Sequence, residues 1–360
     1  MARIIVGLSG GVDSAVAAYL LKAAGHEVLG LTLKTWTNGD GSPGRCCEVE
    51  EARGICDALG IAFYAENAMD SFRKYVIEPF VSDYLLGLTP NPCTMCNPQV
   101  KWGGMLHAAG VFHADYVATG HYARISELAN GRLAVREAAE KNKDQSYMLY
   151  GLTQEQLKKS LFPLGGLSKP EVRSIAEKAG LSVALKKDSQ EICFIDGDDY
   201  GEFVEENAGD RDIKEGNFVD EDGTVLGKHR GIIHYTVGQR KGLGIALGHP
   251  AYVKEIRSDS ADVVLSGDSS LYKKEIGISE INYMGAAPLE ENEEINATVR
   301  IRYRHRGEEA VISKTKGDGL KIIFSEAVRA PAPGQAAVCY DKEGNVLLGG
   351  KIQVLSTLSE

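Results

Sequence analysis

Apolar and polar positions in the first third of the chain follow a repeating order of strand, turn and helix. Residues 4–8 form an apolar run, and a helical pattern over 15–24 follows and ends at Gly25. Further apolar runs of strand length lie at 28–33, 61–64 and 115–119. Continuous apolar runs are typical of parallel strands that helices cover on both faces. Residues 1 to about 125 are therefore predicted to form an α/β domain of repeated βα units.

Helical patterns fill the stretches between these predicted strands. They cover 48–59, 70–86 with an interruption at Pro79, and 99–109. The segment 89–98 lies between the last two and contains three prolines. Each proline fixes the backbone and removes a hydrogen-bond donor, so we expect no regular structure in this segment.

The pattern changes near residue 200. From Gly216 onward, short alternating segments are separated by turn signals such as Asp222-Gly223. This texture predicts small β-rich modules. We expect three domains: an α/β domain over 1–205, a small central β-rich domain over 206–272, and a C-terminal β-barrel over 273–360.

Composition narrows the class of protein. Of the 360 residues, 43% are hydrophobic and 25% are charged, as in an ordinary globular protein. No apolar run is long enough to cross a membrane and no signal peptide is recognisable, so we expect a cytoplasmic protein without a membrane partner. The net charge of −10 argues against a nucleic-acid partner unless basic side chains gather locally.

The turn after the first predicted strand carries the strongest chemical signal. It reads Ser9-Gly10-Gly11-Val12-Asp13-Ser14 and leads into the first predicted helix. A glycine-rich turn before a helix presents backbone N–H groups and a helix dipole to a phosphate. Asp13 would repel a phosphate, so we expect it to hold Mg²⁺ between phosphates or to fix the loop. The spacing is neither a Walker A loop nor a dinucleotide fingerprint, and it resembles the PP-loop of N-type ATP pyrophosphatases.

Three stretches are expected to share one site. Residues 7–14, Leu33 and Gly120-His121 all follow or end a predicted strand. Ligands of open parallel sheets bind at the carboxyl ends of the strands, so these stretches should face the same ligand.

The seven cysteines favour reactive or metal-binding thiols over a disulfide scaffold. Cys93 and Cys96 are spaced to bind a metal, to form a redox pair or to present one activated nucleophile. Cys193 follows Lys186 and Lys187, which would lower the pKa of its thiol if they fold over it, but it can equally end a buried strand. Apolar packing is the favoured interpretation for Cys46, Cys47, Cys56 and Cys339.

Residues 299–306 alternate strictly between apolar or aromatic and basic positions. On a strand, one face would carry Arg300, Arg302, Arg304 and Arg306. Four guanidinium groups on one face can follow a phosphate backbone. The same pattern also fits a solvated face that pairs with the glutamates at 290–294.

Taken together, these motifs resemble the tRNA-specific 2-thiouridylases, and the likeness spans essentially the whole chain. It is carried by 7–14, Asn91-Pro92 with Cys96, 118–124, 143–147, 186–189 with 192–195, 235–245, 302–304 and 333–335. The resemblance implies that sulfur replaces the C2 oxygen of uridine 34, the wobble base of tRNA. Adenylation by ATP would convert that oxygen into part of a leaving AMP and release pyrophosphate.

The resemblance also implies cofactors, partners and site residues. It implies ATP with Mg²⁺, a tRNA with uridine 34, and a persulfide donor, which is a cysteine desulfurase or a sulfur relay protein. Cys193 would carry the persulfide, and Cys96 would free its outer sulfur by forming a disulfide or assist the transfer. ATP would contact Gly7, Leu8, Ser9, Gly10, Gly11, Val12, Asp13, Ser14, Leu33 and Gly120. The target base and tRNA would contact Asn91, Pro92, Cys93, His121, Lys143, Asp144, Gln145, Arg302, Tyr303 and Gln335.

One position departs from the family pattern. Many members carry an aspartate, assigned to general acid–base work, where this chain has Cys93. The substitution creates a set of three thiols, Cys93, Cys96 and Cys193, which resembles the ligands of a [4Fe–4S] cluster whose free iron can hold sulfide.

Two other classes of function stay open at this point. A different PP-loop enzyme, such as an amide-forming synthetase, would not need Cys96 or Cys193. A non-catalytic tRNA-binding or sulfur-carrier protein would not need the intact loop at 9–14.

Overall fold

A parallel sheet forms the centre of the N-terminal domain. The computed structural model describes residues 1–37, 44, 48–186, 192–195, 199–315 and 317–353. The strands are β1 (Arg3–Gly7), β2 (Glu27–Lys34), β3 (Ala62–Asn67), β4 (Tyr116–Ala118) and β7 (Ser160–Leu161), in the order β3-β2-β1-β4-β7 and all parallel. Ile4, Ile5 and Val6 are fully buried because β1 is central and covered on both faces. The predicted α/β fold with a parallel sheet is confirmed.

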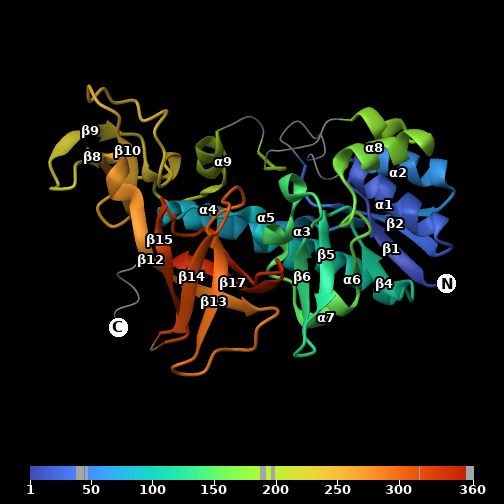
Figure 1. The fold of residues 1–360 in the computed structure, drawn as a ribbon. Helices are drawn as coiled ribbons and strands as arrows, with labels where there is room; N and C mark the ends of the chain where they lie inside the picture. The colour runs from blue at the N-terminus through green and yellow to red at the C-terminus, as the bar shows by residue number, and fades with distance from the viewer. Residues whose placement is uncertain (38–43, 45–47, 187–191, 196–198, 316, 354–360) are drawn as a thin grey trace.

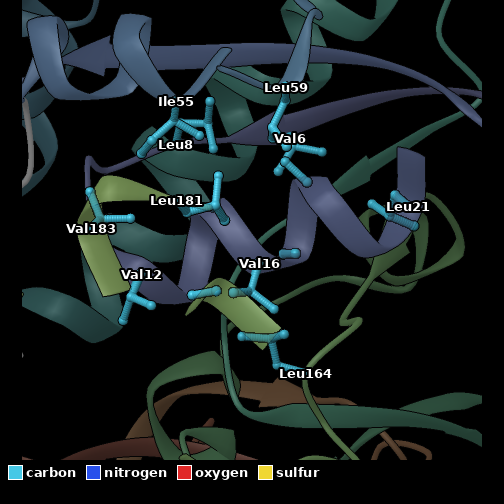
Figure 2. Close-up of a cluster of buried hydrophobic side chains, with 14 of the residues drawn as sticks. Val6, Leu8, Val12, Val16, Leu21, Ile55, Leu59, Leu164, Leu181 and Val183 are labelled. Carbon is cyan, nitrogen blue, oxygen red and sulfur yellow. The ribbon is translucent and has the colours of Figure 1, made fainter. Parts of the chain in front are cut away.

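Three helices pack together over one part of this sheet. They are α1 (Val12–Ala23), α2 (Val49–Leu59) and α8 (Lys169–Lys178). Figure 2 shows the buried core that α1 shares with β1, α2 and the segment around Leu181. Small residues at 15, 17 and 18 let α1 lie close to its neighbours, and each is completely buried.

The remaining long helical segments of this domain are two runs, each interrupted by a π-helical turn. The first run joins α3 (Met69–Phe72), a π-helical turn η1 (Arg73–Ile77) and α4 (Glu78–Leu85). The wide turn comes directly before Pro79, which sits in the first turn of α4, so the interruption occurs where the sequence predicts it. The second run joins α5 (Pro92–Cys96), η2 (Asn97–Lys101) and α6 (Trp102–Val111).

The expectation of no regular structure over 89–98 is wrong, because α5 lies inside it. Pro92 stands in the first turn, where its missing N–H costs no helical hydrogen bond. The side chain of Asn91 caps the helix by accepting a hydrogen bond from the backbone N–H of Cys93 at 3.2 Å. Prolines therefore start these helical turns rather than prevent them.

The rest of the N-terminal domain consists of a hairpin and short helices. The hairpin pairs β5 (Ala123–Glu127) with β6 (Leu133–Glu137). The short elements are η3 (Lys141–Lys143), η4 (Ser146–Leu149), α7 (Gln154–Lys158) and η5 (Ser182–Leu185), and α9 (Tyr200–Asn207) leads into the central module.

Two β modules follow, as the alternating pattern predicts. The central module contains β8 (Gly216–Val219), β9 (Val225–His229), β10 (Tyr252–Arg257) and β11 (Asp262–Ser266), with η6 (Ile232–His234) and, after it, η7 (Asp268–Leu271). The closed C-terminal barrel contains β12 (Tyr272–Tyr283), β13 (Glu294–Arg300), β14 (Glu308–Lys314), β15 (Leu320–Arg329), β16 (Ala336–Tyr340) and β17 (Val346–Gln353). Figure 1 shows the central module at the opposite end of the molecule from β1 and α1, with the barrel between them. Among the described residues, no helix is long and apolar enough to span a membrane.

The expected arginine ladder on one strand is wrong. Strand β13 ends at Arg300, and residues 301–307 form the connection to β14. Arg302, Arg304 and Arg306 are exposed on this connection. We call residues 301–307 the basic turn.

Unlike the exposed arginines of the basic turn, Arg300 binds carboxylates of the N-terminal domain and so joins the barrel to that domain. Its guanidinium donates to Asp144 at 3.0 Å and to Glu137, and lies 4.7 Å from the ring of Tyr340. The side chains of Arg300, Glu137 and Asp144 are 17%, 10% and 1% exposed. Such a largely buried cluster is intolerant of losing one partner, because the remaining carboxylates keep little exposure to water that could replace it.

We expect Arg300→Met to lower the free energy of unfolding by about 3 kcal/mol, because it leaves two buried carboxylates without their shared cation. Urea unfolding monitored by fluorescence measures the change. Arg304→Met is the matched control, since Arg304 is exposed on the basic turn. Equal stability of the two variants would contradict the interdomain role of Arg300.

Candidate functional site

One large cavity lies between the N-terminal domain and the barrel. Its volume is about 1770 Å³. Of the predicted site residues, it is lined by Ser9, Gly11, Val12, Asp13, Asn91, Cys93, His121, Lys143, Asp144, Gln145, Cys193, Arg302, Tyr303 and Gln335. The cavity therefore joins the predicted phosphate loop, two of the three candidate thiols and the basic turn. The predicted residues that do not line it are Gly7, Leu8, Gly10, Ser14, Leu33, Gly120, Pro92 and Cys96.

The phosphate loop follows β1 and is closed by its own hydroxyl groups. Ser14 Oγ donates to the carbonyl of Gly11 at 3.0 Å and accepts from the backbone N–H of Ser9 at 3.3 Å. Gly10 has φ +75°, a left-handed conformation that favours glycine. The loop thus turns tightly and places Gly11 and Val12 at the start of α1, facing the cavity.

Asp13 fixes the loop by binding a lysine from a distant helix. Both of its carboxylate oxygens accept from Lys169 Nζ at 2.8 Å, and one also accepts from the hydroxyl of Tyr122 at 2.8 Å. The Lys169 side chain is 9% exposed. Of the two roles predicted for Asp13, this geometry matches loop fixation. A Mg²⁺ ion would compete with the ammonium group for the same oxygens, so Asp13 as placed does not fit a Mg²⁺ ligand.

A second ion pair lies directly on the phosphate loop. Lys186 Nζ donates to the carbonyl of Gly10 at 3.3 Å and pairs with Glu48. Among the described residues, the Lys186 ammonium group therefore binds the phosphate loop and Glu48, and the hypothesis that it folds over Cys193 stays a prediction. Lys187 lies outside the described residues, as do Cys46 and Cys47.

Gly120 and Leu33 pack behind the residues that line the cavity. A Cβ atom on Gly120 would lie 2.6 Å from the backbone N of Ser14, so β4 approaches α1 closely only with glycine here. Leu33 is half-buried and packs on Gly104 of α6. Both residues lie at the carboxyl ends of strands, as predicted, without lining the cavity.

His121 faces the cavity as a neutral imidazole. Burial beside Trp102 and Phe162 and, to a smaller extent, the charge of Lys101 together lower its pKa to about 3. Its Nδ1 lies 2.8 Å from the hydroxyl of Thr119, which fixes the orientation of the ring. A neutral, oriented imidazole can bind a base or ribose through a hydrogen bond but adds no charge toward phosphate.

The three candidate thiols differ in exposure. Cys93 is exposed, Cys193 is half-buried, and Cys96 is buried at 6% exposure. Cys193 lies in a turn, so the alternative that it ends a buried strand is wrong, although the neighbouring Phe194 is buried at 2% exposure. Among the described side chains, no group of three His, Cys, Asp or Glu is arranged to hold a metal ion.

Two of the predicted tRNA contacts, which lie between η3 and η4 of the N-terminal domain, already bind protein groups. Asp144 is 4% exposed and accepts from Arg300, from Ser146 and from the backbone of Ala138. Gln145 exchanges hydrogen bonds with the backbone of Tyr122 at 2.9 and 3.0 Å.

The remaining predicted contacts lie on the cavity wall. Arg302 donates to the carbonyl of Arg329 at 3.0 Å, and the ring of Tyr303 lies 6.3 Å from that of Tyr147. Lys143 and Gln335 also line the wall.

Lys169, Tyr122 and Glu48 are missing from the residues predicted from the sequence. Lys169 stands beside a capping box, Ser168 with Glu171, which signals only the start of a helix. Glu48 directly precedes α2, and nothing in its local sequence indicates a contact with the phosphate loop. The ion pair of Lys169 with Asp13 joins residues 156 positions apart, so it depends on the tertiary fold alone.

Comparison with known proteins gives consistent matches along the chain. Family models match at 2–197 (tRNA methyl transferase HUP domain), 201–267 (tRNA methyl transferase PRC-barrel domain) and 273–352 (aminomethyltransferase beta-barrel domain). The tRNA-specific 2-thiouridylase MnmA of Lachnoclostridium phytofermentans is 46% identical over 357 residues, covering 97% of this chain and 99% of that protein. The protein of the same name from Acetivibrio thermocellus is 46% identical over 358 residues, covering 97% and 98%.

A solved structure gives a much weaker match. It is the U34-tRNA thiolase NcsA from Methanococcus maripaludis with its [4Fe–4S] cluster, with 20% identity and a TM-score of 0.35 over 54% of this chain and 61% of that one. A likeness of this size supports no inference about function.

We expect Lys169→Met to raise the KM for ATP about tenfold, because the phosphate loop loses the cation that holds Asp13. Pyrophosphate release at varied ATP concentration measures this change. Lys158→Met is the matched control, since Lys158 pairs with Glu155 at 2.7 Å on an exposed helix surface. An unchanged KM in the Lys169 variant would contradict the role of this ion pair.

The lowered pKa of His121 predicts an acid-sensitive stability. Below pH 6.5 the unfolded chain binds a proton at this side chain and the folded chain does not, so the free energy of unfolding falls as the pH falls toward 3. Between pH 6.5 and 5, His121 accounts for at most about 2 kcal/mol of this loss. Urea unfolding at both pH values should show that His121→Gln loses less free energy of unfolding on acidification than the exposed control His107→Gln. Equal losses in the two variants would contradict the role of His121.

Proposed function

This chain belongs to the tRNA-specific 2-thiouridylase family, and we propose that it uses ATP to replace the C2 oxygen of uridine 34 in tRNA with sulfur. The observation that carries the proposal is that the phosphate loop, the thiols of Cys93 and Cys193 and the basic turn all line one cavity. Activation, sulfur transfer and RNA binding need to occur at one place, because an adenylated base and a free sulfide are both reactive toward water or other molecules.

The α/β domain of residues 1–205 is proposed to bind ATP. Backbone N–H groups of the phosphate loop and the start of α1 would hold the phosphates. The C2 oxygen of the base attacks the α-phosphate, pyrophosphate leaves, and the oxygen becomes part of an AMP leaving group. Mg²⁺ would arrive bound to the ATP phosphates, which suits its preference for few protein ligands.

The tRNA would extend from this site over the barrel of residues 273–360, with the central module of 206–272 beside it. Arg302, Arg304 and Arg306 are exposed on the basic turn. Because a turn does not space them regularly as a strand would, they can bind the unevenly spaced phosphates of an RNA loop. Single-stranded loops present unstacked bases to aromatic side chains such as Tyr303. His121, Lys143, Asn91 and Gln335 would contact the same nucleotides.

Cys193 is proposed to carry the persulfide. The thiolate of Cys96 attacks the inner sulfur, a Cys96–Cys193 disulfide forms, and hydrosulfide leaves. The hydrosulfide adds to C2 and expels AMP. A persulfide donor, a cysteine desulfurase or a sulfur relay protein, loads Cys193, and a dithiol reductant in a reducing cytoplasm restores both thiols.

A cluster-based route is the alternative. Cys93 and Cys193 both line the cavity, and Cys93 shares α5 with Cys96. A [4Fe–4S] cluster on these three thiols would hold the sulfide on iron instead of on a persulfide. The described side chains are not arranged to hold a metal, so the persulfide route is the one we favour.

We expect Cys96→Ser and Cys193→Ser to abolish thiolation while tRNA-dependent pyrophosphate release continues, because adenylation needs neither thiol. Liquid chromatography of digested tRNA and a pyrophosphate assay measure the two steps. Cys56→Ala is the control, since Cys56 is buried in the core away from the cavity. Full activity of the Cys96 variant would favour an amide-forming synthetase, and absent pyrophosphate release would favour a non-catalytic protein.

Iron analysis of protein purified without oxygen separates the two sulfur routes. The persulfide route predicts no iron and unchanged metal content in Cys93→Ala. Three to four irons per chain that are lost in Cys93→Ala would establish the cluster route instead.

A further inference from the structure

The backbone that leads into α5 is held by the barrel. The N–H of Thr89 donates to the carbonyl of Pro333 at 2.7 Å. In the opposite direction, Gln335 Nε2 donates to the carbonyl of Thr89 at 3.0 Å and lies 3.5 Å from that of Pro90. The two domains thus exchange hydrogen bonds across one short stretch of backbone.

The barrel side of this contact is rigid. The backbone of Gln335 donates to Ala332 at 3.2 Å and accepts from Ile352 of β17 at 2.8 Å. Gly334 has φ +92°, and a Cβ atom there would lie 2.7 Å from the backbone N of Thr89. The connection between β15 and β16 therefore touches the other domain backbone to backbone, with no room for a side chain.

The other side of the contact leads directly to the thiols. Asn91 follows Pro90 and caps α5, so only Pro90 lies between Thr89, whose carbonyl Gln335 holds, and the cap. Pro90 and Pro92 limit the backbone freedom of this short connection. A displacement at Thr89 is consequently passed on to Cys93 and Cys96.

We propose that Gln335 is a positioning residue, which holds α5 and its thiols in place through Thr89. The inference rests on the thiolation proposed above. The family resemblance assigns Gln335 to tRNA contact alone, whereas here its amide nitrogen binds the backbone of the other domain. Gln335 also lines the cavity, so one side chain would connect the RNA-facing wall with the helix that carries Cys96.

Gln335→Met tests this role, because methionine preserves the shape of the side chain and removes the donor. We expect the alkylation rate of Cys96 by iodoacetamide, measured without tRNA by peptide mass spectrometry, to rise roughly fivefold, the factor that one hydrogen bond is typically worth. We expect kcat for thiolation at saturating tRNA to fall about tenfold because the sulfur-transfer geometry loosens, and the Kd for tRNA to change only as far as the proposed tRNA contact of Gln335 is lost.

Two controls separate positioning from other roles. Gln353→Met removes a comparable amide on β17, which donates to Ser279 and does not touch α5, and should leave Cys96 alkylation unchanged. Cys339 is fully buried in the barrel and reports on global unfolding within the same sample. Since alkylation needs neither ATP nor tRNA, the result stands even if the thiolation itself is disproved.

Three results would overturn the inference. One is a higher Kd for tRNA with an unchanged rate of Cys96 alkylation, which would mean that Gln335 only contacts tRNA. The second is faster alkylation of Cys339 in step with Cys96, which would mean general destabilisation. The third is equal Cys96 alkylation in Gln335→Met and Gln353→Met.

Discussion

The close approach of β4 to the first turn of α1 is the constraint on which the site depends. Gly120 lies within backbone contact of Asp13 and Ser14, so the end of one strand presses on the loop that follows another. The adjacent pairing of β1 with β4 brings these ends together, and Lys169 and Tyr122 then bind Asp13 from the far side. A loop fixed in this way can present its N–H groups without rearranging when a phosphate arrives.

The sequence predicts most of the fold because its apolar periodicity is strong. Strands β1, β2 and β4 were predictable within one or two residues, since central parallel strands must be apolar on both faces. The segment around α5 was not, because Pro90, Pro92 and Pro98 obey a positional rule. A proline forbids the interior of a helix but suits its first turn, and Asn91 as the cap decides between the two.

The sequence predicted many of the residues that form the site but not the side-chain contacts that hold them in place. The loop at 9–14 and the paired cysteines have local signatures, so they could be identified from their spacing. The ion pairs of Asp13 with Lys169 and of Arg300 with Asp144 each join residues 156 positions apart, and no local pattern records them. The alternation at 299–306 misled for a related reason: Arg300 ends its strand by turning to buried carboxylates, and the basic residues beyond it form a turn.

The hydrogen bond between Gln335 and Thr89 also has a consequence for synthesis on the ribosome. The two residues are separated by 246 positions. At the usual elongation rates, about 12 to 50 s pass between the emergence of Thr89 and that of its partner. During that interval an N-terminal domain that has already folded lacks the barrel that holds its α5 helix. A nascent or truncated chain would thus bind ATP before Gln335 could hold its thiols in place, and its sulfur chemistry would be slower than that of the finished chain.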